Sequence, residues 1–304
     1  MKINYYFEIS VNENHSHLVA AQLLFDQLVI DYPEIVFTKV DYRQTDYSYP
    51  IPVYSKFKHN HVSHFFVIIE NPENKKYFLI SCCDKLHCIK DQWDMENCVQ
   101  IFPSSGVHAD DLYYSPNGME YTPFTCLSIR KTLEERSQEL YKLNVPKITP
   151  DKPRFRGCEY LFREWLVKTN DTRFDMECER ISDNEYLLEL SKYSISIDIN
   201  SVAEISGRTV DSLALGLALI RPKLTINFHN ELIPDFHYAS VRCDDISNYP
   251  LLADAYIERF EELKKDKEQV HFLSTNGRKW YEENATINAY VRIAKDLIDF
   301  KKLF

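Results

Sequence analysis

The chain has 304 residues, of which 44% are hydrophobic, and a formal net charge of −10. This length accommodates two domains of about 150 residues each with ordinary cores. The acidic balance disfavours a general binder of nucleic acid or of anionic membranes. The N-terminus carries no long apolar stretch, and no run approaches the ~20 apolar residues of a membrane span, so we expect a cytosolic protein with no membrane span.

Hydrophobic periodicity predicts an α/β arrangement for the first half of the chain. The expected strands are 2–11, 36–40, 64–69, 77–81 and 98–102, and the expected helices are 16–29 and 128–143. Segment 145–154 then carries three prolines in ten residues. Prolines disfavour helix and stiffen the backbone, so we interpret this segment as a linker between domains.

The second half continues the same alternation. The expected strands are 174–178, 194–199 and 217–220, and the expected helices are 160–168, 185–191, 209–215, 251–264 and 269–273. Segment 276–303 indicates one more helix or a broken pair, long enough to pack back on the first domain. The fold class predicted for the whole chain is therefore α/β, with two Rossmann-like domains.

The loop before helix 209–215 is the strongest functional signal. Ser206, Gly207, Arg208 and Thr209 open this helix directly after a buried strand and a polar loop. A helix N-terminus offers unpaired backbone N–H groups, and an arginine beside them adds positive charge. This combination predicts a pocket for an anion, most simply a diphosphate. The loop contains neither G-x-G-x-x-G nor G-x-x-x-x-G-K-[ST], which excludes a classical dinucleotide fingerprint and a P-loop.

A second arginine and the arrangement of acidic residues sharpen this prediction. Arg156 in Phe155-Arg156-Gly157 follows a short strand, and ligands bind open α/β sheets at such strand ends. Two arginines can recognise a pyrophosphate through charge-assisted hydrogen bonds. No two aspartates are spaced as Asp-x-Asp, a common carboxylate clamp for a metal that holds a nucleotide-sugar. The eight cysteines lack a C-x-x-C pattern, so we expect reduced thiols, no metal site and no cofactor.

Four segments together resemble the capsule-associated and protein O-glucosyltransferase families, and more loosely other glycosyltransferases of the GT-B fold. They are Phe155-Arg156-Gly157, the strand segment 190–199, Ser206-Gly207-Arg208 with its helix, and Leu232-IPDFHYAS-Val241. The similarity covers residues 154–280. It implies a nucleotide-diphosphate sugar as donor, a hydroxyl group of a glycan or another molecule as acceptor, and an inverting transfer. The lack of an Asp-x-Asp pattern, which does not depend on the resemblance, predicts that the transfer needs no metal. A cytosolic bacterial or virus-encoded enzyme of glycan assembly fits it best.

The resemblance also implies roles for particular residues. Arg156 and Arg208 would bind the donor diphosphate, with Ser206 and Thr209 as nearby donors. The remaining donor-side candidates are Glu204 and Asp211 for the ribose or base and His229 for the donor sugar.

The domains implied are an acceptor-side domain 1–148, a donor domain 149–275 and a C-terminal helix 276–304. The transfer needs a base within reach of the acceptor hydroxyl, and the first domain offers four candidates: His15, His17, Asp110 and Asp111. Two other functions remain open: a nucleotide-sugar epimerase on the same fold, and a non-catalytic binding module.

Overall fold

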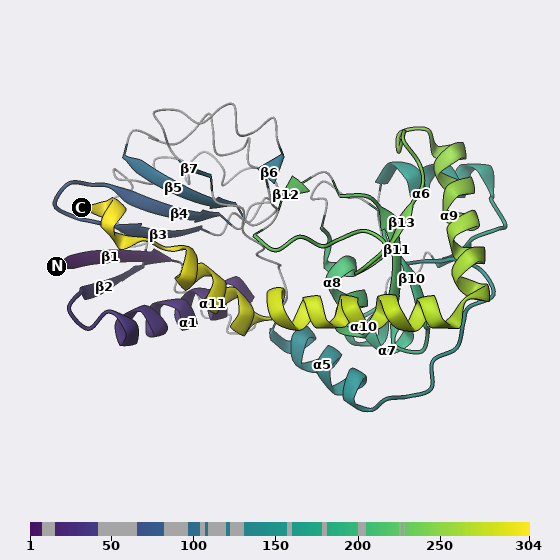
Figure 1. The fold of residues 1–304 in the computed structure, drawn as a ribbon, viewed down its shortest axis with the longest axis horizontal. Helices are drawn as coiled ribbons and strands as arrows, with labels where there is room; N and C mark the ends of the chain where they lie inside the picture. The colour runs from purple at the N-terminus through teal and green to yellow at the C-terminus, as the bar shows by residue number, and fades with distance from the viewer. Residues whose placement is uncertain are drawn as a thin grey trace. The chain divides into compact units, whose positions relative to one another are not determined.

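The computed structural model describes most of the chain, and its contacts divide the described residues into two compact units (Figure 1). The described residues are 1–7, 16–41, 66–81, 97–103, 107–108, 120–121, 131–156, 160–177, 181–199, 205–224, 226–227 and 229–304. The first unit comprises Met1–Lys131, Ile226–Glu231 and Asn284–Phe304. The second unit comprises Thr132–Thr225 and Leu232–Glu283. The predicted division at residues 148 and 275 stays a prediction.

The first unit is built on a mixed six-stranded sheet. Its strands, in the order β2-β1-β3-β4-β5-β7, are β2 (Val36–Asp41), β1 (Lys2–Phe7), β3 (Phe66–Glu70), β4 (Tyr77–Ser81), β5 (Cys98–Pro103) and β7 (Glu120–Tyr121). β3 runs antiparallel to both β1 and β4, and the other neighbouring pairs are parallel. A separate antiparallel pair joins β6 (Val107–His108) to β12 (Ile226–Asn227).

Two helices from distant parts of the sequence share the core of this unit. α1 (Ser16–Asp31) lies beside α11 (Ile287–Leu297), and apolar side chains of both belong to the buried cluster that includes the sheet. A 3-10 turn, Phe300–Leu303, follows α11. The side-chain amides of Asn71 and Asn74 donate to the Leu303 carbonyl oxygen at 3.0 and 2.8 Å. The C-terminal segment is thus an integral part of the first unit.

The second unit has a parallel three-stranded sheet of β10 (Ile195–Ile197), β11 (Ala218–Pro222) and β13 (Ala239–Val241), in that order. A second parallel pair joins β8 (Arg154–Arg156) to β9 (Asp175–Glu177). The described residues of this unit also form six helices: α5 (Lys131–Lys142), α6 (Tyr160–Thr169), α7 (Asp183–Leu190), α8 (Gly207–Ala214), α9 (Tyr249–Lys265) and α10 (Lys267–Asn284).

Apolar side chains on β10 and β11 anchor the core of the second unit. Ile195 and Ile220 belong to one buried cluster with Tyr256 and Phe260 of α9. Ile199, just beyond β10, joins the same cluster. This packing fixes the end of β10, and the residues beyond it carry the polar site described below.

Helix α10 differs from the sequence expectation. We predicted a helix over 269–273 and one more helix or a broken pair over 276–303, whereas α10 runs without a break over Lys267–Asn284 and a new helix begins at Ile287. Gly277 lies inside α10, where an added Cβ would come within 2.6 Å of the His237 carbonyl oxygen. The glycine therefore allows a close approach of two backbones and does not end the helix.

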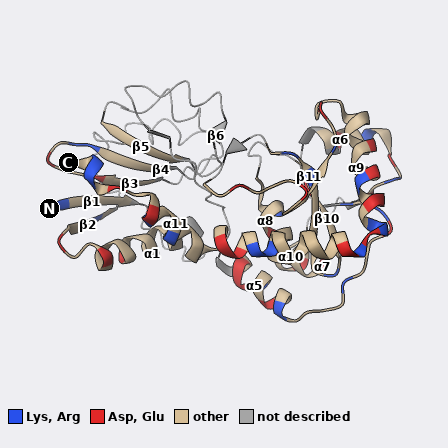
Figure 2. Ribbon diagram, viewed as in Figure 1, with Lys and Arg blue, Asp and Glu red and all other residues tan. Residues whose placement is uncertain are grey.

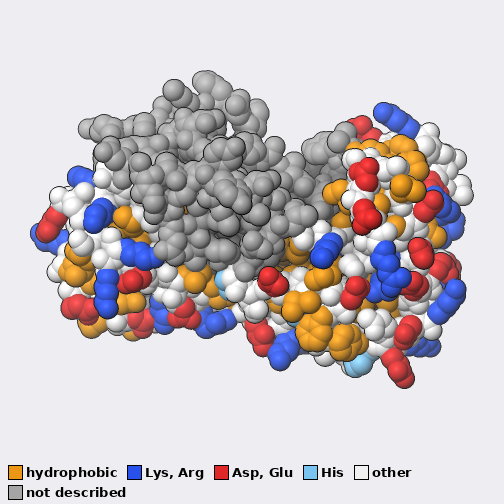
Figure 3. Space-filling view, turned by 45° about the horizontal axis from the view of Figure 1, so that its top comes forward, with side chains coloured by type: hydrophobic (Ala, Val, Ile, Leu, Met, Phe, Trp, Pro, Cys, Tyr) orange, Lys and Arg blue, Asp and Glu red, His pale blue; other side chains and the backbone are white. Residues whose placement is uncertain are grey.

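Charge is spread over the helices. Acidic and basic residues are interspersed along α9 and α10 (Figure 2). Exposed hydrophobic side chains lie among charged ones on the described surface (Figure 3). None of the helices in the described ranges has the length and apolar character needed to span a membrane.

Candidate anion-binding site

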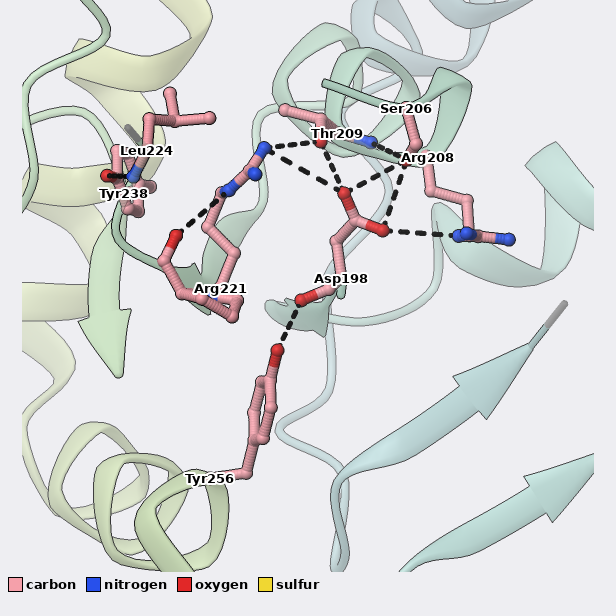
Figure 4. Close-up of polar contacts among 9 residues, drawn as sticks. Asp198, Ser206, Arg208, Thr209, Arg221, Leu224, Tyr238 and Tyr256 are labelled. Atoms are coloured by element: carbon pink, nitrogen blue, oxygen red, sulfur yellow. Dashed lines mark hydrogen bonds and ion pairs between the residues drawn. The ribbon is translucent and has the colours of Figure 1, made fainter. Parts of the chain in front are cut away.

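Asp198 is the centre of a buried polar cluster at the end of β10 (Figure 4). Its side chain is 0% exposed, and its backbone N–H donates to the Ile220 carbonyl, which continues the β10–β11 ladder by one residue. The carboxylate accepts hydrogen bonds from the hydroxyl of Ser206 at 3.0 and 3.1 Å and from the hydroxyl of Thr209. Arg208 adds a charge-assisted bond from Nε at 3.2 Å.

A second arginine enters the cluster from the neighbouring strand. Arg221 of β11 has a fully buried side chain, and its guanidinium lies 4.0 Å from the Asp198 carboxylate. The same guanidinium donates to the Thr209 hydroxyl at 2.8 Å and lies 5.8 Å from the ring centre of Tyr238. Breaking a buried pair of this kind costs about 3–5 kcal/mol because it leaves an unpaired buried charge. Two guanidinium groups therefore face one carboxylate here.

The start of α8 lies directly above this cluster. Ser206 is the N-cap, and its side chain accepts from the Thr209 N–H. Gly207, the first helical residue, is exposed, and no described heavy atom lies within 4 Å of the position that a Cβ would take there. The opening turn of α8 thus presents backbone next to open space, with the side chain of Arg208 20% exposed beside it.

The structure brings together three of the residues predicted for the anion pocket. Ser206, Arg208 and Thr209 converge on one point, but the group that they contact in this structure is the carboxylate of Asp198. Binding of an external anion by these residues stays a prediction. The geometry shows how they are held: one internal carboxylate fixes the side chains at the N-cap, second and third positions of α8.

Asp211 lies on α8, three residues beyond Arg208. Burial raises the pKa of its carboxyl group to about 7, the negative charges of Asp183 and Asp198 act in the same direction, and Arg208 opposes them. Its predicted role at a ribose or base stays a prediction. Burial also raises the pKa of Tyr256, with the charge of Asp198 as a further cause. The Tyr256 hydroxyl donates to the Asp198 carbonyl oxygen at 2.6 Å.

A small recess lies beside the cluster. It measures about 30 Å³ and is lined in part by Arg154, Tyr193, Ser196 and Arg208. Arg154 belongs to β8. Arg154 is ion-paired with Asp175 at 3.0 Å and bonded to the Tyr193 hydroxyl. Arg154 and Arg208 both line this recess, and the predicted role of Arg156 stays a prediction.

The segment 232–241, part of the family resemblance, is held by internal contacts. The Asp235 carboxylate accepts from the Ser240 hydroxyl at 2.8 Å and from Arg259 at 2.7 Å. His237 Nδ1 accepts from the Ile233 N–H at 2.8 Å, and burial lowers the pKa of this imidazole to about 4. The Tyr238 hydroxyl accepts from the Leu224 N–H. This segment therefore supports Arg221 from the side away from Asp198.

The other predicted site residues lie elsewhere or outside the described residues. His229 belongs to the first unit, where its Nε2 lies 3.2 Å from the side-chain oxygen of Asn284 and burial lowers its pKa. Outside the described residues lie His15, Asp110, Asp111 and Glu204, as do the side chains of His17 and Arg156. Their roles stay predictions.

Sequence reasoning missed Asp198 and Arg221. Arg221 did leave a signal, because it is the one charged residue in the apolar run Ala218–Pro222. Asp198 lies between two isoleucines, Ile197 and Ile199, at the end of a strand. A charge in such a run needs a buried partner, and the two together could have indicated an ion pair between neighbouring strands.

No protein-family model and no curated protein matches this chain. Among solved structures, it is similar to the pneumococcal O-GlcNAc transferase GtfA in complex with UDP and GlcNAc, with 11% identity, a TM-score of 0.42, and coverage of 67% of this chain and 45% of that one. For the C-terminal domain of a group 1 glycosyl transferase family protein from Francisella tularensis, the identity is 14%, the TM-score 0.32 and the coverage 53% and 86%. For the sucrose-phosphate synthase from Thermosynechococcus elongatus, they are 15%, 0.42, and 72% and 61%.

Two of these three proteins are named as glycosyl or O-GlcNAc transferases, the class of enzyme that the sequence resemblance indicates. The chain spans less than half the length of the pneumococcal enzyme. All three TM-scores are below 0.5, so we base no conclusion about the fold or the activity of this chain on these similarities.

Proposed function

We propose that this chain is a glycosyltransferase of the GT-B type that binds the diphosphate of a nucleotide-sugar at the start of α8. The observation that carries the proposal is the exposed Gly207 at the start of α8, where an added Cβ would meet no described atom. Arg208 and Arg221 together outnumber the single carboxylate of Asp198. An excess of positive charge beside a helix N-terminus favours a bound anion. The four sequence segments that resemble glycosyltransferases support sugar transfer as the reaction.

The finer parts of the proposal come from the sequence. The donor sugar moves to a hydroxyl acceptor with inversion, without a metal, and one of His15, His17, Asp110 and Asp111 takes the proton from the acceptor. Arg156 contributes to binding of the diphosphate. Glu204 and Asp211 bind the ribose or base, and His229 binds the donor sugar. Removal of a general base costs ~10²–10⁴ in rate and leaves donor binding intact, which separates the base from the binding residues.

Calorimetry with UDP, GDP, ADP and CDP tests the binding step. At least one of them should bind the wild type, and Arg208→Ala should weaken that binding by about 1.5–3 kcal/mol, because it removes a charge-assisted bond to the diphosphate. Arg173→Ala is the matched control: this arginine lies in the same unit, is 45% exposed and pairs with Asp171 and Asp254. Its removal should leave the affinity unchanged.

Gly207→Ala is a second probe of the same site. A methyl group there meets no described atom, so the fold should tolerate it, but it occupies the space through which a phosphate would approach the backbone. We expect a loss of nucleotide affinity with an unchanged unfolding midpoint. Equal affinities for the wild type, Arg208→Ala and Gly207→Ala would remove the anion site from α8.

A further inference from the structure

We propose that Asp198 is a positioning residue for this anion site: it holds Arg208 and the opening turn of α8 in the geometry that receives a phosphate group. This inference rests on the proposed function and deepens it. Asp198 itself does not face the ligand, because its side chain is fully buried beneath Ser206 and Thr209.

The contacts form one connected path from β11 to Arg208. Arg221 donates to the Thr209 hydroxyl at 2.8 Å, the Thr209 hydroxyl donates to the Asp198 carboxylate, and the carboxylate accepts Arg208 Nε at 3.2 Å. Figure 4 shows the Arg208 side chain extending from the start of α8, with its Nε directed at Asp198. A bond at Nε restricts the plane of the guanidinium, which sets the direction of its terminal N–H groups.

The same carboxylate also orders the backbone. Through Ser206 it fixes the N-cap, and through Thr209 it fixes the third residue of the helix, so the intervening backbone N–H groups at Gly207 and Arg208 are held between two tethered side chains. A ligand then meets donors that are already oriented, and binding requires less ordering of the site. The negative charge of Asp198 opposes an anion at longer range, but two arginines balance it.

Thr209 offers the mildest way to test this role. Thr209→Val keeps the shape of the side chain and removes the hydroxyl that links Arg221 to Asp198, whereas Thr209→Ser keeps the hydroxyl. We expect Thr209→Val to weaken binding of inorganic pyrophosphate, measured by calorimetry, by about tenfold, and Thr209→Ser to remain within about twofold of the wild type. Thermal unfolding of each variant verifies that the fold is retained.

A double-mutant cycle separates positioning from a general structural effect. If Asp198 and Thr209 act through Arg208, then Thr209→Val should weaken pyrophosphate binding much less in an Arg208→Ala background than in the wild type. Equal losses in both backgrounds would overturn the inference, as would wild-type affinity in Thr209→Val.

Asp198→Asn is the direct variant, and Asp171→Asn is its matched control. Asp171 also pairs with an arginine of the second unit, Arg173 at 2.6 Å, but in the turn before β9. Only Asp198→Asn should weaken pyrophosphate binding, and equal losses in the two variants would contradict the inference. If the wild type binds no pyrophosphate at all, the proposed function fails as well; if it binds and the Thr209 variants are indistinguishable, only the positioning role fails.

Discussion

The raised pKa of Asp211 should make the folding stability of the protein depend on pH. Its pKa is raised from 3.8 to about 7, with burial as the largest cause. Between these two values the folded protein holds a proton that the unfolded chain releases, so this group's contribution to stability is fully present below pH 3.8 and is lost as the pH rises through 7.

Asp211→Asn should remove this pH dependence. When the pH is raised from 4 to 8, the stability of the variant relative to the wild type should increase by on the order of 2 kcal/mol. The wild type must ionise a desolvated carboxyl group at the higher pH, and the variant has no such group. Urea unfolding of both proteins at the two pH values measures the difference. If the variant and the wild type differ by the same unfolding free energy at both pH values, the pKa of Asp211 is not raised in the folded protein.

Some residues of the site could be predicted from the sequence, and others could not. Ser206, Gly207, Arg208 and Thr209 were predicted together because capping and helix-start preferences are local, and a few adjacent residues express them. Asp198 and its partner on β11 were missed because their meaning depends on strand pairing, which brings together residues that are 23 positions apart in a parallel register. Whether a buried charge stabilises or destabilises the fold depends on the partner that strand pairing brings beside it.

Helix α8 is held at both ends. At its C-terminus, Arg278 of α10 donates to the Ala214 carbonyl, and Lys147 donates to the carbonyl oxygen of Gly216 at 2.7 Å. Gly216 has a φ of +61°, as expected for the glycine that ends a helix. Carbonyl groups at a helix C-terminus lack partners within the helix, so cations beside them stabilise it.

Arg278→Met should therefore destabilise the second unit. Arg278 is nearly buried, and its guanidinium also lies 4.1 Å from the ring centre of Tyr141. We expect a loss of about 1–3 kcal/mol in urea unfolding. Lys279→Met is the control on the same helix, because Lys279 is 70% exposed and its ion pair with Glu283 is 3.9 Å long, so its removal should change stability by less than about 0.5 kcal/mol. Similar losses in both variants would contradict the capping role.

At the level of elements, the periodicity predicted the α/β class and most helices and strands, because each pattern lies within a short window. It did not predict the antiparallel direction of β3, since the direction of a strand depends on the connections around it. The break expected between residues 273 and 276 was wrong, because α10 is continuous there, and Gly277 within it allows the backbone of His237 to approach closely.

The whole molecule should bind its donor without a divalent metal. This prediction rests on the arginines at α8 and on the lack of an Asp-x-Asp motif in the sequence. Calorimetry of the best-binding nucleoside diphosphate should give the same affinity, within about twofold, in EDTA and in manganese, because guanidinium groups neutralise the phosphates. Binding that appears only with manganese would contradict the metal-independent mechanism.

The first unit is assembled from three separate stretches of chain, and the last of them, Asn284–Phe304, supplies α11. This helix covers α1, and buried side chains such as Tyr290 and Phe300 complete the core begun by β1. During synthesis, however, the strands of the first sheet leave the ribosome long before α11 is made. We therefore expect the second unit, whose segments end at Glu283, to be complete before α11 is made, and the sheet of the first unit to keep an apolar face uncovered until residues 284–304 have followed.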